Sequence, residues 1–278
     1  MGVHGQLGLF STESAQQTSV MENAPVTSAL SLEVTFNNSP SENKLSPILE
    51  SIRKEIAKIN GELKNFSLVE EKPWFKKTFI ALDVETTGLD AASCRVIELA
   101  MVPFNASSNN NFSQLFSTGE PLPPEITRIT GISDEMLDGQ PHFGAKAQQI
   151  LELLKDADFI VAYNAKFDRP FLESELARVD MALPDIPWVD PYIFICELDR
   201  YKKGKKLVDA AQRWGVTLNN AHRAQADAQA AGELLQKISN KIEAVTLANL
   251  LEQQKILSWK QAHSMAEYKK ASAWSINR

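Results

Sequence analysis

The sequence predicts a mixed α/β fold in which a five-stranded sheet is flanked by helices, and three observations support this prediction. An apolar run at residues 79–85, FIALDVE, is typical of a buried strand. Strand patterns at residues 95–104 and 111–118, joined by the polar turn NASSNNN, predict a meander with that first strand. Strand and helix patterns then alternate, which is typical of a sheet with helices on its faces.

Each remaining element has its own signal. The pair Pro123-Pro124 favours the first turn of a short helix that ends at Gly131, because proline suits a first turn and glycine suits the residue after a helix. The later patterns predict, in chain order, a helix at 143–154, a strand at 159–163, a helix at 170–179, a strand at 186–190, helices at 207–214 and 223–241, and a helix within 244–270. We expect a central domain at residues 74–241 and a helical extension at 242–278.

The chain before this domain has a different composition. Residues 11–45 are rich in Ser, Thr, Asn and Glu and show no helical or strand period, so residues 1–45 are expected to form a flexible, disordered leader. Ser46-Pro47 is a good cap and first-turn pair. Apolar residues then recur at helical spacing: Ile48, Ile52, Ile56, Ile59 and Leu63. Residues 46–70 are therefore expected to hold an amphipathic helix and a linker.

Composition excludes several classes of protein. With 278 residues, 44% of them apolar and 23% charged, the chain lies in the globular range. No apolar run approaches the roughly 18 to 20 residues of a membrane span, and no targeting segment is recognisable, so a cytoplasmic location is expected. Two cysteines and four scattered histidines fit neither a disulfide framework nor a zinc site, so carboxylates would have to hold any metal. A net charge of -6 argues against a protein that wraps duplex nucleic acid. Any nucleic-acid partner would have to be bound locally.

Two carboxylates lie on the first predicted strand. Asp83 and Glu85 are two residues apart, so both side chains point to one face, whereas Leu82 and Val84 point to the other. Acids on an apolar strand are costly unless a positive group lies between them. An exposed strand end with solvated acids is the alternative. The position at the carboxyl end of an α/β strand, where such sheets bind ligands, favours a functional role.

Asp168 and Asp227 accompany later elements. Asp168 follows the strand at 159–163 and precedes a predicted helix, where a helix N-cap is the simpler interpretation. Asp227 shares a helical stripe with Ala224, Ala231 and Leu234, which places a carboxylate on the face that packs on the sheet and therefore requires a partner.

His222 lies five residues before Asp227, a spacing that would place the two far apart around one helix. His222 is therefore expected in the preceding loop, from which its side chain can approach the same site. A solvated loop histidine is the alternative.

Together these residues resemble one known constellation. The segments LDVETTGL, ITGISDEML, YNAKFD and HRAQADA occur in the order found in the DEDD family of 3'-to-5' exonucleases, in its histidine subtype. Residues 79–238 are similar to the proofreading epsilon subunit and the exonuclease domain of bacterial DNA polymerase III.

The resemblance implies a ribonuclease-H-like fold and a two-metal phosphodiester hydrolase. It implies that Asp83, Glu85, Asp168 and Asp227 hold two divalent ions, with Asp83 bridging them. Oxygen ligands of this kind favour Mg²⁺ or Mn²⁺. The same resemblance makes His222 the general base, a role that suits the ordinary imidazole pKa of about 6.5. The five catalytic residues are thus Asp83, Glu85, Asp168, His222 and Asp227.

The resemblance also implies contacts with the substrate. A turn approaches the terminal nucleotide through its backbone, an apolar residue wedges against the base, and two further residues line the pocket. These positions correspond to Thr86, Thr87, Gly88, Leu89, Asn164 and Phe167. A simple tight turn at Gly88 is the alternative interpretation of the first of these segments.

Two positions depart from the family pattern. Tyr163 and Thr130 stand where many proofreading subunits have histidine. In the family these positions affect substrate contact rather than metal binding, so the departures bear on the substrate preference and not on the activity.

A basic run precedes the helix at 207–214 and comprises Arg200, Lys202, Lys203, Lys205 and Lys206. Contact with a phosphate backbone and a solvated helix start are equally good interpretations.

The leader contains a peptide that resembles a clamp-binding motif. Gln6, Leu7, Leu9 and Phe10 match the Gln-Leu-x-Leu-Phe peptide with which bacterial replication and repair proteins bind the sliding clamp. A chance match of five residues is the alternative. Its place on a flexible leader of an apparent DNA exonuclease favours clamp binding.

The expected function is metal-dependent 3'-to-5' exonuclease activity on single-stranded or frayed 3' ends of DNA, releasing nucleoside 5'-monophosphates in proofreading or repair. The sliding clamp and a polymerase subunit are the candidate partners, and no membrane is expected. A 3' exoribonuclease of the same family is one alternative, because the catalytic set does not distinguish the two sugars. A catalytically silent clamp-binding adaptor is another, disfavoured because all five catalytic positions are filled.

Overall fold

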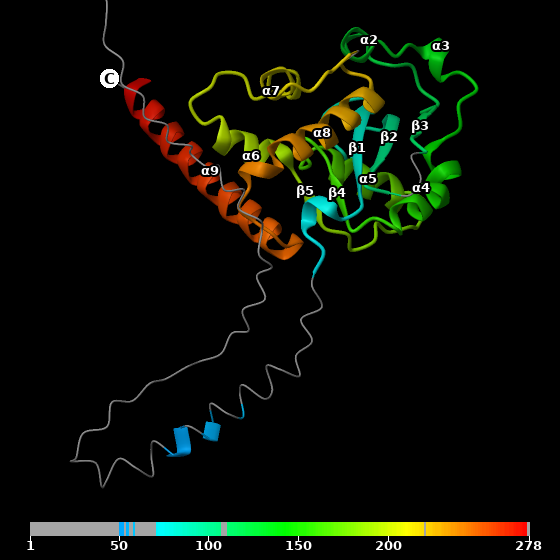
Figure 1. Ribbon diagram of the computed structural model, residues 1–278. Coiled ribbons are helices and arrows are strands. Elements are labelled where there is room, and N and C mark those ends of the chain that lie inside the picture. Colours follow the sequence, from blue (N-terminus) through cyan, green and yellow to red (C-terminus); the bar gives the residue numbers. More distant parts are fainter. Residues whose placement is uncertain are drawn as a thin grey trace, which may run out of the picture. The chain divides into compact units, whose positions relative to one another are not determined.

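The computed structural model describes residues 71–106, 110–219 and 221–276, together with residues 50–52, 54, 55 and 58 (Figure 1). The chain divides into two compact units, Met1–Val69 and Glu70–Arg278. In the first unit, the six described residues are helical. The remainder of the predicted helix at 46–70 and the leader with its clamp-like peptide lie outside the described residues.

The second unit contains a five-stranded sheet with the order β3-β2-β1-β4-β5. Its strands are β1 Phe79–Thr86, β2 Val96–Phe104, β3 Phe112–Leu115, β4 Phe159–Val161 and β5 Trp188–Val189. The pairs β1–β2 and β2–β3 are antiparallel, whereas β4 is parallel to both β1 and β5. The predicted mixed sheet with a leading meander is confirmed.

Helices cover both faces of this sheet. The helices are α2 Pro124–Thr130, α3 Asp134–Leu137, α4 Ala147–Leu154, α5 Asp168–Ala177, α6 Pro191–Leu198, α7 Leu207–Trp214, α8 Ala224–Ile238 and α9 Leu247–Ile276, with short 3-10 turns at Trp74–Lys76, Phe143–Lys146 and Ser239–Lys241. One core joins β1 to α6, α7 and α8, and a second joins the opposite face to α4 and α5. Within the described residues, no helix combines the length and apolarity needed to cross a bilayer.

Three helices differ from the expectation, and the first is the four-residue α3, which the predicted elements lack. α6 is absent from the predicted elements, because its sequence PYIFICEL is apolar almost throughout and lacks helical periodicity. Its first turn is nevertheless well specified, since Pro191 occupies the first helical position and the Asp190 carboxylate accepts a hydrogen bond from the Tyr192 backbone. α5 begins at Asp168 rather than at Pro170, so proline lies in the first turn, where its missing N–H is tolerated.

The alternation of β1 decides which side chains meet α8. Phe79 and Ala81 belong to the core on the α8 face, whereas Leu82 and Val84 belong to the opposite core. Asp83 and Glu85 continue the α8 face. α8 packs on β1 (Figure 1), so both acids lie on the face of β1 that α8 covers.

α8 lies unusually close to β2. A Cβ atom added at Gly232 would lie 2.2 Å from the Phe104 ring, so only glycine fits at this crossing. Glycine within a helix costs about 0.5 to 1 kcal/mol relative to alanine, a cost that this close packing offsets.

The C-terminal segment contacts the sheet through side-chain amides. Gln254 on α9 accepts a hydrogen bond from the Asp190 backbone at 2.7 Å and donates one to the Trp188 carbonyl at 2.9 Å. The Trp74 indole donates to the Ala244 carbonyl at 2.8 Å. The division of the chain at residue 241 stays a prediction, and these bonds connect both sides of that position.

Candidate active site

The predicted catalytic residues converge at the carboxyl end of β1. Asp83 and Glu85 extend from β1, Asp168 is the first residue of α5, and Asp227 lies in the first turn of α8. Asp168 is buried and does not cap its helix, whose N-cap residue is Phe167. Its carboxylate instead accepts a hydrogen bond from the Val84 backbone at 3.2 Å, which fixes the start of α5 against β1.

The acids raise one another's pKa values. The pKa of Asp83 lies well above its ordinary value, first because the group is buried and then because Asp168, Asp227 and Glu85 are close. Burial raises the pKa of Asp168 to about 8, although the Val84 hydrogen bond opposes the shift. Burial, then Asp227, raises the pKa of Glu85 to about 7. The folded chain thus holds mutually repelling carboxyl groups that a cation would stabilise.

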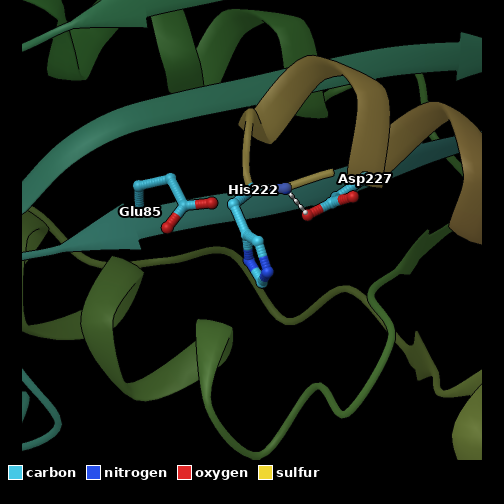
Figure 2. Close-up of side chains that lie close together, drawn as sticks. All are labelled: Glu85, His222 and Asp227. Carbon is cyan, nitrogen blue, oxygen red and sulfur yellow. Dashed lines mark hydrogen bonds between the residues drawn. The ribbon is translucent and has the colours of Figure 1, made fainter. Parts of the chain in front are cut away.

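His222 and Asp227 complete the cluster (Figure 2). The His222 backbone N–H donates to Asp227 Oδ2 at 3.1 Å. His222 itself adopts a left-handed backbone with φ 68°, and its side chain is exposed in the loop ahead of α8. Ligand atoms of Glu85, His222 and Asp227 lie within 4.8 Å of one another. The expectation that His222 approaches Asp227 from outside the helix therefore agrees with the geometry.

The donor set fits a hard divalent cation. The Oδ1 atom of Asp227 is buried and accepts no hydrogen bond from the described residues. A buried carboxylate oxygen without a partner is costly, and carboxylate oxygens are the ligands that Mg²⁺ and Mn²⁺ prefer. Burial also raises the pKa of Asp227, as expected for an acid that lacks its counter-ion.

One ion pair beside this cluster is not anticipated from the sequence. Glu98 on β2 is 1% exposed and receives hydrogen bonds from Arg223 Nη2 at 2.9 Å and from the Ala224 backbone at 3.1 Å. Arg223 is the N-cap residue of α8 and directly follows His222. The pair therefore attaches the His222 loop to the sheet. An acid within the apolar run of β2 is the signal that could reveal it.

The turn after β1 is tightly constrained. Thr87 exchanges two hydrogen bonds of 2.9 Å with the Arg95 backbone, one through its N–H and one through its hydroxyl. A Cβ atom at Gly88 would lie 2.6 Å from Cys94 Sγ, so a larger residue there would have to displace the Cys94 side chain. Leu89 follows at the tip and is 88% exposed. The structure thus presents Leu89 to solvent on a closed loop, as a residue that wedges against a base would require.

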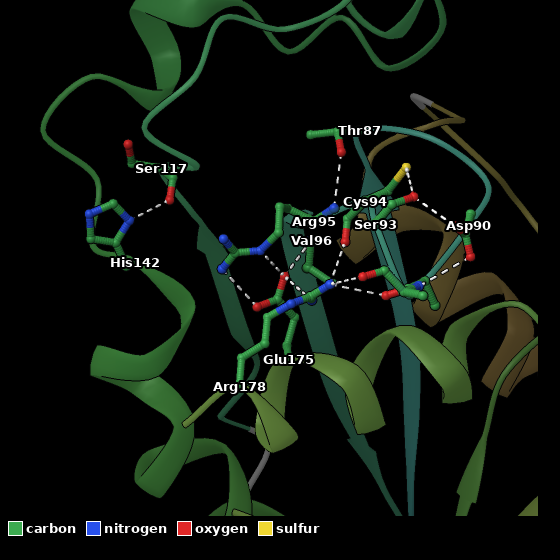
Figure 3. Close-up of polar contacts among 12 residues, drawn as sticks. Thr87, Asp90, Ser93, Cys94, Arg95, Val96, Ser117, His142, Glu175 and Arg178 are labelled. Atoms are coloured by element: carbon green, nitrogen blue, oxygen red, sulfur yellow. Dashed lines mark hydrogen bonds and ion pairs between the residues drawn. The ribbon is translucent and has the colours of Figure 1, made fainter. Parts of the chain in front are cut away.

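A second ion-pair network, also missed from the sequence, supports this loop (Figure 3). Glu175 on α5 is 1% exposed and accepts hydrogen bonds from Arg95 Nε at 2.8 Å and from the Val96 backbone at 3.0 Å. Arg178 Nη1 lies 3.2 Å from the same carboxylate, and Arg178 Nη2 donates to the carbonyls of residues 91, 92 and 94. Glu175 on α5 and Arg178, at the end of that helix, therefore hold the second half of the loop, from residue 91 to residue 96.

Replacing Glu175 with glutamine is expected to destabilise the protein by about 2 to 4 kcal/mol, because two arginines would lose a buried partner. Urea denaturation measures this change. Glu173→Gln on the same helix is the control, since the one ion pair of Glu173 with a described residue is the exposed pair with Arg169, and this change should alter stability by less than about 0.5 kcal/mol. Equal stabilities of the two variants would show that the network does not hold the loop.

Asn164 and Phe167 follow β4. The Asn164 backbone has φ 69° and its N–H donates to the Asp190 carboxylate at 2.8 Å, while the Phe167 ring packs on Phe171 with centroids 5.0 Å apart. Both residues have structural contacts, and their role in binding substrate stays a prediction.

The two departures from the family pattern also have structural contacts. The Thr130 hydroxyl donates to the Ile126 carbonyl at 2.9 Å at the end of α2. The Tyr163 hydroxyl donates to the Lys205 carbonyl at 2.5 Å, and burial raises the Tyr163 pKa above its ordinary range.

Comparison with known proteins agrees with this site. The family model for exonucleases of the RNase T type matches residues 80–235. The chain is 34% identical over 168 residues to "DNA polymerase III PolC-type" of Halalkalibacterium halodurans, covering 59% of this chain and 11% of that protein. It is 30% identical over 181 residues to "3'-5' exonuclease DinG" of Bacillus subtilis, covering 63% of this chain and 19% of that protein. The chain thus spans less than a fifth of the length of these relatives.

Solved structures share the fold. A crystal structure of E. coli exonuclease I with a dT13 oligonucleotide has a TM-score of 0.52 and 20% identity, over 59% of this chain and 41% of that chain. The zinc-bound form of the exonuclease I complex with single-stranded DNA has a TM-score of 0.53 and 19% identity, with the same coverage of each chain. The predicted ribonuclease-H-like fold is confirmed.

Proposed function

Because the chain belongs to the RNase T exonuclease family, we propose that it hydrolyses the terminal phosphodiester bond at the 3' end of DNA and releases nucleoside 5'-monophosphates. The observation that carries this proposal is the convergence of four carboxylates and His222 at the carboxyl end of β1. The names of the relatives, a 3'-5' exonuclease and a DNA polymerase, support the polarity and the substrate.

Asp83, Glu85, Asp168 and Asp227 would hold divalent cations. Bound there, Mg²⁺ or Mn²⁺ would supply charge stabilisation at the attacking and leaving oxygens of an in-line displacement at phosphorus. Three observations support this assignment: the raised carboxyl pKa values, the Asp227 Oδ1 atom that accepts no hydrogen bond from the described residues, and the convergence of the acids at the end of β1.

His222 would remove a proton from the attacking water. Its ring lies within 4.8 Å of carboxylate oxygens of Glu85 and Asp227, which would stabilise the imidazolium that forms. The Arg223–Glu98 pair would hold the backbone from which the ring projects. Leu89 and the turn at residues 86–88 would bind the terminal nucleotide.

A comparison of substrates tests the proposal. Single-stranded DNA, a primer-template with a mismatched 3' end and single-stranded RNA, each labelled at the 5' end, are incubated with and without Mg²⁺. Stepwise shortening of DNA from the 3' end, only with metal, is the expected result. Preferential digestion of RNA would replace the DNA assignment with the exoribonuclease alternative, and no digestion would favour a silent adaptor.

The leader would tether the enzyme to a sliding clamp. This part of the proposal rests on the peptide Gln6-Leu7-Gly8-Leu9-Phe10 in the sequence. A coil over residues 11–44, as composition predicts, has an end-to-end distance of about 30 Å. Such a linker would raise the local concentration of the exonuclease at a 3' end near the clamp. We expect this to matter for a chain with net charge -6, whose own affinity for DNA should be low.

Changing Leu9 and Phe10 to alanine is expected to abolish clamp binding and clamp-stimulated digestion, with unchanged activity on free oligonucleotides. Calorimetry with a bacterial clamp and a peptide of residues 1–15 measures the interaction directly. The control is a peptide with Leu7, Leu9 and Phe10 intact and Ser11→Ala. Absence of binding by the native peptide would refute the tether and leave the exonuclease proposal intact.

A further inference from the structure

Two side chains, those of Asp199 and Arg213, hold the turn at residues 199–206 between α6 and α7. The buried Asp199 carboxylate accepts hydrogen bonds from Arg213 Nε at 2.8 Å and Trp214 Nε1 at 3.3 Å. The other guanidinium nitrogens of Arg213 donate to the carbonyls of Lys203 at 3.1 Å and Gly204 at 2.7 Å. Arg213 therefore fixes the backbone on both sides of the turn.

Two further features restrict the turn to one shape. Lys205 points inward, and its ammonium donates to the Asp199 carbonyl and, at 2.8 Å, to the Lys202 carbonyl. Gly204 has φ 73°, and a Cβ atom there would lie 2.6 Å from the Asp209 carboxylate. The turn is preorganised by contacts that leave its remaining side chains free to face outward.

The outward side chains are basic and aromatic. Tyr201 is 91% exposed, the largest exposed fraction among the large apolar side chains of the described residues. Lys202, Lys203 and Lys206 are exposed and form no ion pair within the described part of the chain. Arg200 pairs with Glu197 at 2.5 Å. An exposed aromatic ring on a turn whose backbone is held in place, flanked by exposed ammonium groups, can stack on a base and contact the adjacent phosphates.

The turn is hydrogen-bonded to the chain just beyond the carboxyl end of β4, at the end of the sheet where the candidate active site lies. The Tyr163 hydroxyl donates to the Lys205 carbonyl, and Tyr163 directly precedes Asn164 at the carboxyl end of β4. Because β4 is parallel to β1, the carboxyl end of β4 lies at the same end of the sheet as Asp83 and Glu85. The segment between α6 and α7 reaches that end of the domain (Figure 1).

We propose that residues 199–206 bind the single-stranded nucleic acid that continues away from the 3'-terminal nucleotide, with Tyr201 stacking on a base and Lys202, Lys203 and Lys206 contacting phosphates. The inference rests on the proposed exonuclease function and adds a second contact for the same substrate strand. A chain with net charge -6 and a cluster of acids in its candidate active site needs a local cluster of positive charges to bind a polyanion.

Binding without catalysis tests the turn directly. Fluorescence anisotropy of a labelled oligothymidylate is measured in chelator with the full chain, with Tyr201→Ala, and with Lys202→Ala combined with Lys203→Ala. Tyr201→Ala is expected to weaken binding by about 5- to 100-fold, the range for loss of one stacked base. The lysine variant is expected to reduce the slope of log affinity against log salt by about 1.4, because two phosphate contacts are lost.

A small reporter separates the turn from the active site. Hydrolysis of thymidine 5'-monophosphate p-nitrophenyl ester with Mn²⁺ should be equal in all three proteins, because this ester has no second nucleotide. A matched control on another surface combines Trp259→Ala with Lys260→Ala, since Trp259 is also exposed. Unchanged DNA affinity in both turn variants, or an equal loss in the control, would overturn the inference. Failure of the native chain to hydrolyse the reporter would count against the exonuclease function alone, since the anisotropy measurement does not require catalysis.

Discussion

Asp83→Asn is expected to abolish 3'-end digestion while raising the thermal stability of the metal-free protein. Asp83 lies in the middle of the acid cluster, so amide substitution removes the group best placed to hold cations. The same substitution removes repulsion with Asp168, Asp227 and Glu85, which should stabilise the folded state in chelator by about 1 to 2 kcal/mol at neutral pH. Digestion assays with Mn²⁺ and thermal melts in chelator measure the two effects.

The stabilisation should depend on pH with a defined sign. The pKa of Glu85 is raised to about 7 and that of Asp168 to about 8, so the folded state binds more protons than the unfolded state above the ordinary carboxyl pKa. Without metal, stability should therefore fall as the pH rises from about 4 to 8. Asp83→Asn should flatten this decline. Added Mg²⁺ or Mn²⁺ should raise the melting temperature of the native chain more than that of the variant.

Asp90→Asn is the matched control, because Asp90 lies just after the same strand and its pKa is lowered by its hydrogen bond with Ser93. This control should retain digestion. Substantial digestion by Asp83→Asn would exclude the proposed metal site, and a lower melting temperature in chelator would show that the acids do not repel one another in the folded state.

His222→Ala is expected to lower turnover by roughly 10²- to 10⁴-fold, the range that general acid–base catalysis supplies. The dissociation constant for metal should change little, because the carboxylates alone are proposed to hold the cations. The backbone N–H that donates to Asp227 is retained in the variant, so the loop should keep its attachment. Single-turnover kinetics and a metal titration followed by thermal stability separate the two quantities.

His142→Ala is the control, since this exposed histidine bonds the Ser117 carbonyl at 2.8 Å and belongs to a different part of the fold. Turnover of the control should match that of the native chain. If the acid limb of the pH–rate profile is the same with and without His222, the base lies elsewhere.

The fold is largely predictable because its pattern is local. The period of two along β1 is enough to assign Asp83 and Glu85 to one face, and the two hydrophobic cores confirm that assignment. α6 escapes prediction because an apolar helix buried on several sides has no amphipathic period to detect. Its signal is the Asp190-Pro191 pair, which specifies a helix start.

The candidate site is predictable to a smaller extent. Spacing and resemblance together name the residues that the structure brings together, but a helix N-cap is the wrong local interpretation of Asp168, because Phe167 caps the helix and the carboxylate bonds β1. Glu98 and Glu175 escape prediction for one physical reason. Each pairs with an arginine far away in sequence, and only the folded chain shows that a buried acid has such a partner.

The absence of a side chain at Gly232 has a consequence for the geometry of the candidate active site. Phe104 fills the space that a methyl group would need, so Gly232→Ala would lift α8 from the sheet rather than fill a void. Asp227 lies five residues earlier on the same helix, so its carboxylate would move away from β1 together with α8. We expect the Gly232→Ala variant to remain folded and to keep all the candidate catalytic residues, but with a longer distance between Asp227 and the acids on β1. Substitutions that damage the site are therefore expected at the contact between α8 and β2 as well as among the acids. A smaller side chain at Phe104 should make room for the added methyl group and restore the position of Asp227.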